Sequence, residues 1–468
     1  MKKVLYWLTA GLLATATGGC NTFLDPAPVD LQPGDTFLNS PSNVEGVLAS
    51  AYDALQSGDF YGGQIQRIGT LYSDDIDISR VTGQFVEDFR TRQFGIFNGP
   101  GRSVWSNGYK TIYRSNIVLK AITDNPAGAP AADNDRRKGE ALFLRGLAQF
   151  ELVRFFALPY TAGPDNLGIV LRLTPPTTQE ATVPTPRSTV GQTYAQIISD
   201  LNTAVALLPA TSVPGRANKI SARAILARVY FNQADYNNAF TQSDAAITAA
   251  TAAGITLGAA DSTGTVSPFR SVGAQQAPGV LFQMVNSASD DATGDLRNIF
   301  YSTFGPASLT ADTLAGGPLA LLEPGDLRRR YLLAADPGDP TNRIPTSLKF
   351  QGSDPVNVPV VRLAEMYLTR AESRVQRGSF TAADVRADLN AVRTHAGLPA
   401  DNTTTDATQL LTKIRNQRRV ELLFENDRFH ELRRLKSTNI RGRSYNDSSA
   451  LLKIPASETS ANPAIVQN

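Results

Sequence analysis

The sequence predicts a mainly α-helical protein in which paired helices form a scaffold that carries a long, less regular segment. Apolar residues recur three and four positions apart in many stretches of 36–250 and 360–468, which is the spacing of amphipathic helices. Within 251–359, Gly, Pro, Ser, Thr and Asp dominate, and this periodicity is lost except around 313–322. Because so long a stretch cannot form one bare loop in a compact protein, we expect an irregular subdomain with short strands there.

The N-terminus has the pattern of a secretory signal that ends at a lipid attachment site. Lys2 and Lys3 precede an apolar run over 4–16, which is shorter than the about 20 residues that a bilayer crossing needs. Small residues then lead to Cys20, the only cysteine of the chain, and the arrangement resembles the acylated cysteine of bacterial lipoproteins. Thr17 departs from that pattern, in which an aliphatic residue is usual, and a secreted protein with a stray cysteine is the alternative.

These features predict two N-terminal segments and a lipid attachment site. We expect a signal peptide over 1–19, a lipid on Cys20 and an extended, Pro-containing tether over 20–35. No other stretch is long and apolar enough to span a membrane, so the mature protein is expected to be anchored to the membrane by its lipid.

The composition excludes several classes of function. A net charge of +2, from 45 basic and 43 acidic residues, gives no reason to expect nucleic acid. The arginine clusters 328–330 and 418–419 lie among acidic residues, and we interpret them as solvated helix faces. One cysteine excludes intrachain disulfides and Cys-rich zinc sites.

The periodic segments predict the helices in order along the chain. An irregular region is expected between Ser57 and Gly101, and a Pro- and Thr-rich loop over 159–186. In the segment around 144–155, the stripe of apolar residues leaves Arg145 and Arg154 on the far side of the helix. The expected helices span 43–55, a stretch from near Ser103 through Leu119, 138–158, 190–208, two helices within 219–250 joined at 232–236, and further pairs within 361–397 and 407–436.

The pair within 219–250 follows the tetratricopeptide pattern, in which small residues let two helices of a hairpin approach closely. Arg223 departs from it, where an aromatic residue is usual, and so does Ser243, where Phe is usual. The matching positions are Leu226, Ala227, Tyr230, Ala239 and Ala246. Looser matches elsewhere predict about four such hairpins in all, so the expected fold is a tetratricopeptide-like scaffold with an irregular, loop-rich subdomain.

Motifs along nearly the whole chain, taken together, resemble the SusD/RagB family of outer-membrane nutrient-binding lipoproteins of Bacteroidetes. The most specific part is the C-terminal pattern R-R-x-E-L, followed by Phe424-Glu425, Arg428 and 431–434, although His430-Glu431 departs from the aromatic-acidic order that is frequent in the family. The other matching elements are 23–25, 51–52, Trp105 with Tyr109, Ile112 and Asn116, 140–145, 200–209, 222–230, 325–328, 362–365, 371–372, 454–455 and 462–463.

The resemblance implies a single domain over 36–468 that binds oligosaccharides at the cell surface, in the outer membrane. The implied partner is a TonB-dependent, SusC-like transporter barrel, over which the lipoprotein sits as a lid. Some members of the family bind peptides, so a peptide-binding protein or one that mainly docks the transporter is the alternative.

No catalytic arrangement is evident in the sequence. The two histidines, His395 and His430, are far apart and neither has a nucleophile beside it, which favours structural or solvated roles. Two carboxylates at a suitable separation could hydrolyse a glycoside, so an acidic glycosidase is a third, less favoured hypothesis. The acidic runs 74–77 and 290–291 offer oxygen ligands but lack the spacing of a calcium loop, and we interpret them as solvated turns or ligand-bonding acids. We therefore predict no enzyme activity, no cofactor and no metal.

Sugar recognition couples an aromatic face to hydrogen-bonding side chains. Phe97 and Asn98 lie just before a predicted helix, where the resembled family tends to place a stacking residue. Trp105 starts that helix, and packing is its alternative role. An ordinary core or surface position is the alternative for each candidate. The predicted ligand-binding residues are Phe97, Asn98, Asp75, Arg80, Tyr301, Phe304 and Trp105.

Overall fold

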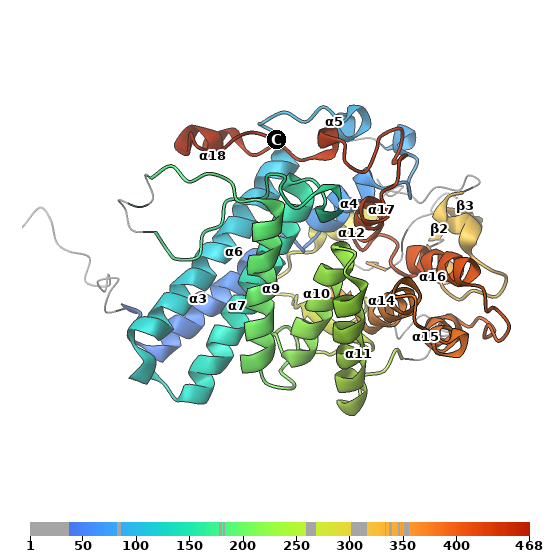
Figure 1. Cartoon of the computed structure of the whole chain (residues 1–468), viewed down its shortest axis with the longest axis horizontal. Helices are drawn as coiled ribbons and strands as arrows, with labels where there is room; N and C mark the ends of the chain where they lie inside the picture. The colour runs from blue at the N-terminus through green and yellow to red at the C-terminus, as the bar shows by residue number, and fades with distance from the viewer. Residues whose placement is uncertain are drawn as a thin grey trace, which may run out of the picture.

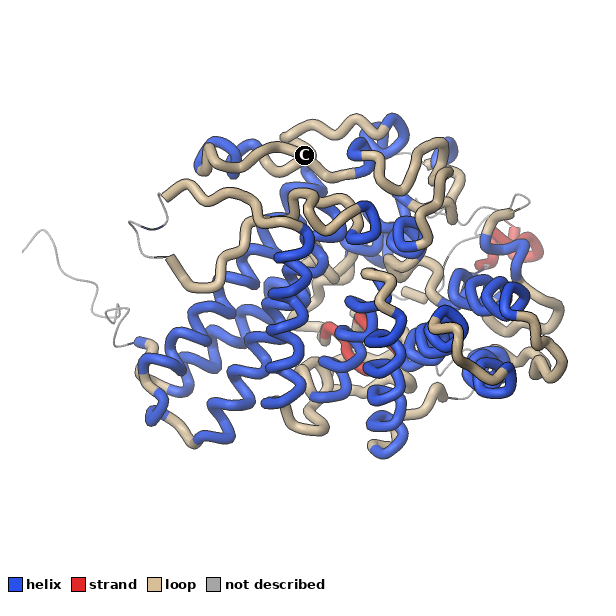
Figure 2. The backbone as a smooth tube through the Cα atoms, viewed as in Figure 1, coloured by secondary structure: helices blue, strands red, loops and turns tan. Residues whose placement is uncertain are grey.

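The computed structural model is mainly helical, as the sequence predicts (Figures 1 and 2). The predicted signal peptide and tether, with Cys20, lie outside the residues that it describes. Those residues are 37–81, 86–176, 180, 183–258, 268–300, 316–332, 334–336, 339–344, 347, 349–350 and 355–468. Among them, no helix combines the length and apolar character that crossing a bilayer requires.

The long helices form a continuous array in which each packs against the next (Figure 1). They are α3 (Pro41–Gln56), α6 (Gly99–Asp124), α7 (Ala131–Phe156), α9 (Val190–Leu207), α10 (Lys219–Asn232), α11 (Tyr236–Ala252) and α14 (Leu363–Gln376). The array then continues to α15 (Ala382–His395) and α16 (Ala407–Glu421), which both pack on α14. The chain closes with α17 (Arg428–Arg434) and α18 (Ala456–Ala461).

Local signals start several of these helices where the sequence predicts them. Thr189 and Gln192 form a reciprocal capping box at the start of α9, and Asn218 and Ser221 do the same for α10. Asn98 caps α6 through its side chain, several residues before the start that periodicity indicates.

Helix α7 lies at the centre of the N-terminal half and is buried on nearly all sides from Gly139 to Phe156, because α3, α6 and α9 surround it. Gly108 on α6 permits the close approach, since a Cβ there would overlap the side chain of Leu152 on α7. The prediction that Arg145 and Arg154 face away from the core is wrong: each is only 6% exposed and pairs with a carboxylate. A helix enclosed by other helices has no solvent face on which to place them.

Helices α10 and α11 form the hairpin that the tetratricopeptide pattern predicts, with Ala227, Ala239 and Ala246 fully buried between the helices and their neighbours. Ser243, where the pattern has Phe, is also buried, and its hydroxyl donates to Ala239 O at 2.7 Å. Helices α14 and α15 form a second close pair.

The segment between α11 and α14 holds the strands. β1 (Val280–Met284) pairs antiparallel with β4 (Val358–Arg362), and β2 (Ala334–Asp336) pairs antiparallel with β3 (Asp339–Ile344). Every residue of β1 and of β4 is buried, so this strand pair belongs to the core. Two short helices also lie here, α12 (Gly294–Phe300) and α13 (Arg329–Leu332).

Two helices lie in the region that the sequence predicts to be irregular. They are α4 (Gln64–Tyr72) and α5 (Val86–Thr91). Seven of the nine residues of α4 are buried, and Ile65, Ile68 and Leu71 among them follow one another at helical spacing. The helix is only nine residues long and its apolar stripe lies among Gly58, Gly62, Gly63 and Gly69, so hydrophobic periodicity did not separate it from an irregular region.

Candidate ligand-binding site

Phe97 is the most exposed large hydrophobic side chain among the described residues, at 80%, and its neighbour Ile96 is 40% exposed. Both lie in the loop between α5 and α6. The loop is held at three points close to Phe97. Asn98 Oδ1 accepts from Gly101 N at 2.8 Å, Asn98 Nδ2 donates to Asp88 Oδ2 at 2.7 Å, and Ile96 O accepts from Ala456 N at 3.1 Å. The loop is therefore held in place by hydrogen bonds, and it exposes the aromatic ring of Phe97 to solvent.

An aromatic cluster lies beneath this loop. The ring of Tyr72 at the end of α4 stacks on Phe429 of α17 at 4.6 Å between centroids and also contacts Phe89 and Phe94 edge-on or tilted. Arg92 Nη2 donates to Tyr72 O and Ile440 O, at 3.4 and 3.2 Å, which ties the loop to the chain after α17. The cluster anchors the segment 86–97 to α4, which precedes it, and to α17, which is remote in sequence.

The acidic pair Asp74 and Asp75 lies next to this cluster and forms ion pairs instead of a solvated turn. Asp75 is 3% exposed, and its Oδ1 accepts from Arg419 Nε at 2.7 Å. Asp74 accepts from Arg428 Nε and Nη2 at 2.7 and 2.9 Å. Burial, with a smaller contribution from the neighbouring Asp74 charge, raises the pKa of Asp75 to about 6. The expectation of a solvated turn is therefore wrong for this pair.

Arg419 also donates to Gly316 O at 2.9 Å. Its guanidinium therefore joins α16 to the segments that contain Asp75 and Gly316, both of which are remote in sequence. The prediction that residues 418–419 and 328–330 form solvated helix faces is wrong for Arg328 and Arg418, which are 7% and 1% exposed. Arg328 donates to both oxygens of Asp326, at 3.0 and 2.7 Å. Arg418 donates to Asp427 Oδ2 at 2.8 Å.

The C-terminal motif as a whole forms a buried network of ion pairs. Arg362 at the end of β4 donates to Glu421 Oε1 at 2.7 Å and to Glu425 Oε2 at 2.7 Å. Lys349 donates to Glu425 Oε1 at 2.6 Å, and Arg434 to Glu372 Oε1 at 3.0 Å. Its charged residues hold β4, α14, α16 and α17 together, which is a structural role.

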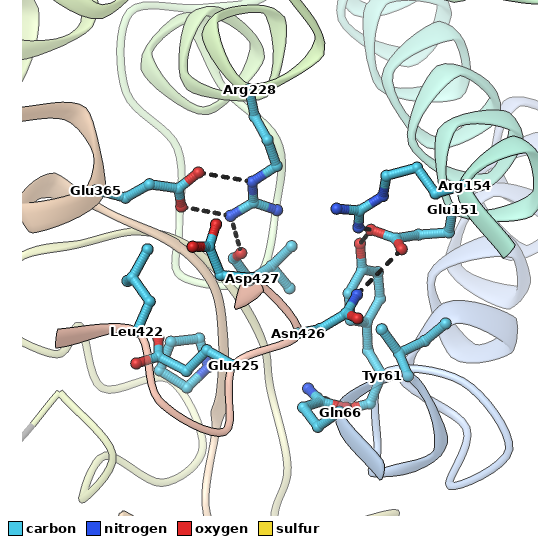
Figure 3. A pocket seen from close by; sticks show the side chains of 13 residues that line it. Tyr61, Gln66, Glu151, Arg154, Arg228, Glu365, Leu422, Glu425, Asn426 and Asp427 are labelled. Atoms are coloured by element: carbon cyan, nitrogen blue, oxygen red, sulfur yellow. Dashed lines mark hydrogen bonds and ion pairs between the residues drawn. The ribbon is translucent and has the colours of Figure 1, made fainter. Parts of the chain in front are cut away.

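A small polar cavity lies inside the molecule where α4, α7, α10 and α14 meet the turn 422–427 (Figure 3). On one side Arg228 donates to Glu365 at 2.8 and 2.6 Å, and on the other Tyr61 donates to Glu151 at 2.7 Å. The cavity measures about 20 Å³, which is room for one water molecule. A sugar ring is many times larger and does not fit in this cavity.

The seven predicted site residues differ in whether the structure exposes them to a ligand. Phe97 is exposed, whereas Trp105 is 1% exposed and packs between Tyr109 and Phe156 at 4.7 and 4.9 Å, so it offers no face to a ligand. Asn98 and Asp75 are buried in the cap and the ion pair described above. Arg80 ends the short 3₁₀ helix Ile78–Arg80, while Tyr301 and Phe304 lie outside the described residues.

Sequence reasoning missed Ile96, which widens the exposed apolar surface beside Phe97. The only signal was its adjacency to Phe97 in a stretch rich in glycine, since a single apolar residue in a loop carries no periodicity. It also missed Asp88, which fixes the capping residue and lies in a helix that the sequence did not predict.

Within the described residues, neither histidine has a hydrogen bond to a side chain from which it could take a proton. His430 is 4% exposed, lies edge-on to Phe155 at 5.1 Å, and burial with the charges of nearby arginines holds its pKa well below the ordinary value. His395 Nδ1 lies 2.6 Å from Gly258 O. Within the described ranges, no three His, Cys, Asp or Glu side chains are grouped to hold a metal ion.

Comparison with known proteins places the chain in a family. Residues 22–231 match a family described as "Starch-binding associating with outer membrane", and residues 346–450 match one described as "SusD family". A SusD-like protein of Bacteroides ovatus is 28% identical over 243 residues, which are 52% of this chain and 41% of that protein. The matched part is thus less than half the length of that relative.

Solved structures share the fold over nearly their whole length. A SusD superfamily protein of Bacteroides vulgatus superposes with a TM-score of 0.78 at 25% identity, covering 92% of this chain and 98% of that one. A SusD-like carbohydrate binding protein of the same species superposes with a TM-score of 0.76 at 22% identity, covering 91% and 97%. The two family matches together span more than half of the sequence, and the chain belongs to the SusD family.

Proposed function

We propose that the protein is a non-catalytic, cell-surface lipoprotein that captures oligosaccharides and delivers them to a TonB-dependent, SusC-like transporter of the outer membrane. The observation that carries the proposal is Phe97, an aromatic side chain 80% exposed on a loop that hydrogen bonds hold in place. A rigid, exposed aromatic face is suited to stacking on the apolar face of a sugar ring. The family description, starch binding with outer-membrane association, supports the same conclusion.

Affinity electrophoresis of residues 21–468 through gels that contain individual polysaccharides tests the capture step. We expect one polymer class to retard the protein and Phe97→Ala to abolish the retardation. Tyr113→Ala is the matched control, because Tyr113 is also an exposed aromatic residue, at 47%, but lies along α6. Retardation that survives Phe97→Ala would remove this residue from the site. A protein that no polysaccharide retards would favour peptide cargo or a role in docking alone.

The anchor is a separate part of the proposal. The single cysteine at the end of a signal-like segment supports acylation of Cys20 in the outer membrane. Mass spectrometry of the N-terminal peptide from purified outer membranes should detect acyl chains on Cys20. A Cys20→Ser variant should leave the membrane fraction. A membrane-bound variant without acyl chains would refute lipid anchoring.

Delivery to a transporter is the third part. Co-purification of the anchored protein from outer membranes should recover a TonB-dependent barrel. Recovery of the protein alone, under conditions that preserve other outer-membrane complexes, would contradict a stable partnership.

A further inference from the structure

A surface groove lies where the start of α10 meets the last turns of α11 (both helices are labelled in Figure 1). None of the described residues that line it belongs to the loop that carries Phe97. Its volume is about 580 Å³, within the range of ligand pockets. The groove exists because the side chains along it are small: its lining includes Ala210, Ala245, Ala249, Ala252 and Ala253. A larger side chain at these positions would fill it.

Two cations line one side of this groove. Lys219 and Arg223 are four residues apart on α10, so they lie on the same face of the helix. Arg223 Nη1 donates to Gln242 Oε1 at 3.3 Å, but neither cation pairs with a carboxylate within the part of the chain that the structure describes. Arg223 also occupies the position where the tetratricopeptide pattern has an aromatic residue, so a charge replaces a packing group there.

Asp244 is the one acidic residue among the described residues that line the groove, and it does not neutralise this charge. Asp244 on α11 accepts from Arg370 Nη1 of α14 at 2.8 Å, and Arg370 is itself held by Asp388. The groove therefore combines an apolar floor of alanines with two cations on one side. Charges of the opposite sign, spaced along an extended chain with small apolar side chains between them, would complement it.

We propose that the groove between α10 and α11 binds an acidic, partly apolar peptide segment of a partner protein, whose carboxylates pair with Lys219 and Arg223. The site is separate from the Phe97 loop, so occupation of one leaves the other open. It would let the protein hold a partner and a glycan at the same time.

Fluorescence anisotropy of a labelled peptide of alternating Glu and Leu residues, titrated with the full-length chain in mild detergent, tests the proposal. The double variant Lys219→Glu/Arg223→Glu should bind roughly tenfold more weakly, the loss expected when two exposed ion pairs are removed. Ala249→Trp, which fills the groove without changing charge, should also weaken binding. Added salt should weaken binding to the unaltered protein.

The matched control is Arg102→Glu/Lys110→Glu, which makes the same charge change at two exposed positions of α6. It should bind as the unaltered protein does. Circular dichroism verifies that each variant is folded. Equal affinity for a peptide of alternating Lys and Leu, no binding of the acidic peptide, or unchanged binding by the groove variants would each overturn the proposal. None of these outcomes bears on glycan capture, which is measured separately at Phe97.

Discussion

Arg145 on α7 holds Asp200 on α9 through two parallel hydrogen bonds, each 2.7 Å long. Both side chains are almost fully buried, at 7% and 3% exposure. Nη1 of the same guanidinium donates to Asn116 Oδ1 on α6 at 2.8 Å and to Leu173 O at 3.1 Å. One side chain therefore joins three helices and the loop that precedes α9.

Replacing Arg145 by Met should lower the free energy of unfolding by about 3–5 kcal/mol, because it leaves Asp200 buried without its cation. The double variant Arg145→Met/Asp200→Leu should recover much of this loss. Urea denaturation followed by circular dichroism measures both. Lys120→Met is the control, since the exposed pair Lys120–Asp124 contributes at most about 0.5 kcal/mol. Equal losses for the two single variants would contradict the structural role of the buried pair.

Gly69→Ala should destabilise the protein by about 1–3 kcal/mol. A Cβ at Gly69 on α4 would overlap the side chain of Asn426, which has a left-handed backbone (φ 64°) in the turn between α16 and α17. Gly46→Ala is the matched control, because a Cβ there meets nothing within 4 Å and alanine is the better helix former. The control should be neutral or stabilising in the same denaturation experiment. A harmless Gly69→Ala would mean that α4 and the turn are less closely packed.

The buried His430 should make the protein sensitive to acid. Burial first, and then the charges of Arg154, Arg433 and Arg228, hold its pKa well below the ordinary value. The unfolded chain therefore binds the proton first as the pH falls below about 6.5, and stability declines by up to about 1.4 kcal/mol per pH unit until the folded pKa is reached.

His430→Phe removes this titration and keeps the ring contacts with Phe155 and Phe429. The stability of this variant relative to the unaltered protein should rise between about pH 7 and about pH 5. Thermal unfolding across that range measures the difference. A constant difference would show that His430 does not titrate as its surroundings require.

Asn98→Ala should cost about 1 kcal/mol of stability, because it removes the side-chain cap of α6. It should also weaken glycan retardation, since Phe97 is the adjacent residue and the loop loses its bond to Asp88. Asn98→Ser keeps an oxygen that can cap the helix and should retain most of the stability. If Asn98→Ala lowers stability but leaves retardation unchanged, the position of Phe97 does not depend on the cap.

The helices and the candidate residue Phe97 show which features a local sequence pattern can predict. The stripes of α3, α9, α10 and α11 predict those helices to within a few residues, because an amphipathic surface helix records its buried face in its own sequence. Helix α4 was not predicted because it spans only nine residues and its apolar stripe lies among glycines. Phe97 was predictable as a loop aromatic, whereas Trp105 has the same chemistry and is buried, which only its contacts with Tyr109 and Phe156 reveal.

The sequence by itself determined the mainly helical fold and the order of the family motifs. The tertiary structure alone decided which charges are buried. Arg419 and Asp75 are 344 positions apart and yet form a 2.7 Å hydrogen bond. A charge can be buried only where an opposite charge or other polar group meets it, and that meeting depends on how remote elements pack. Charged motifs that look solvated when read locally therefore became the ion pairs that hold the molecule together.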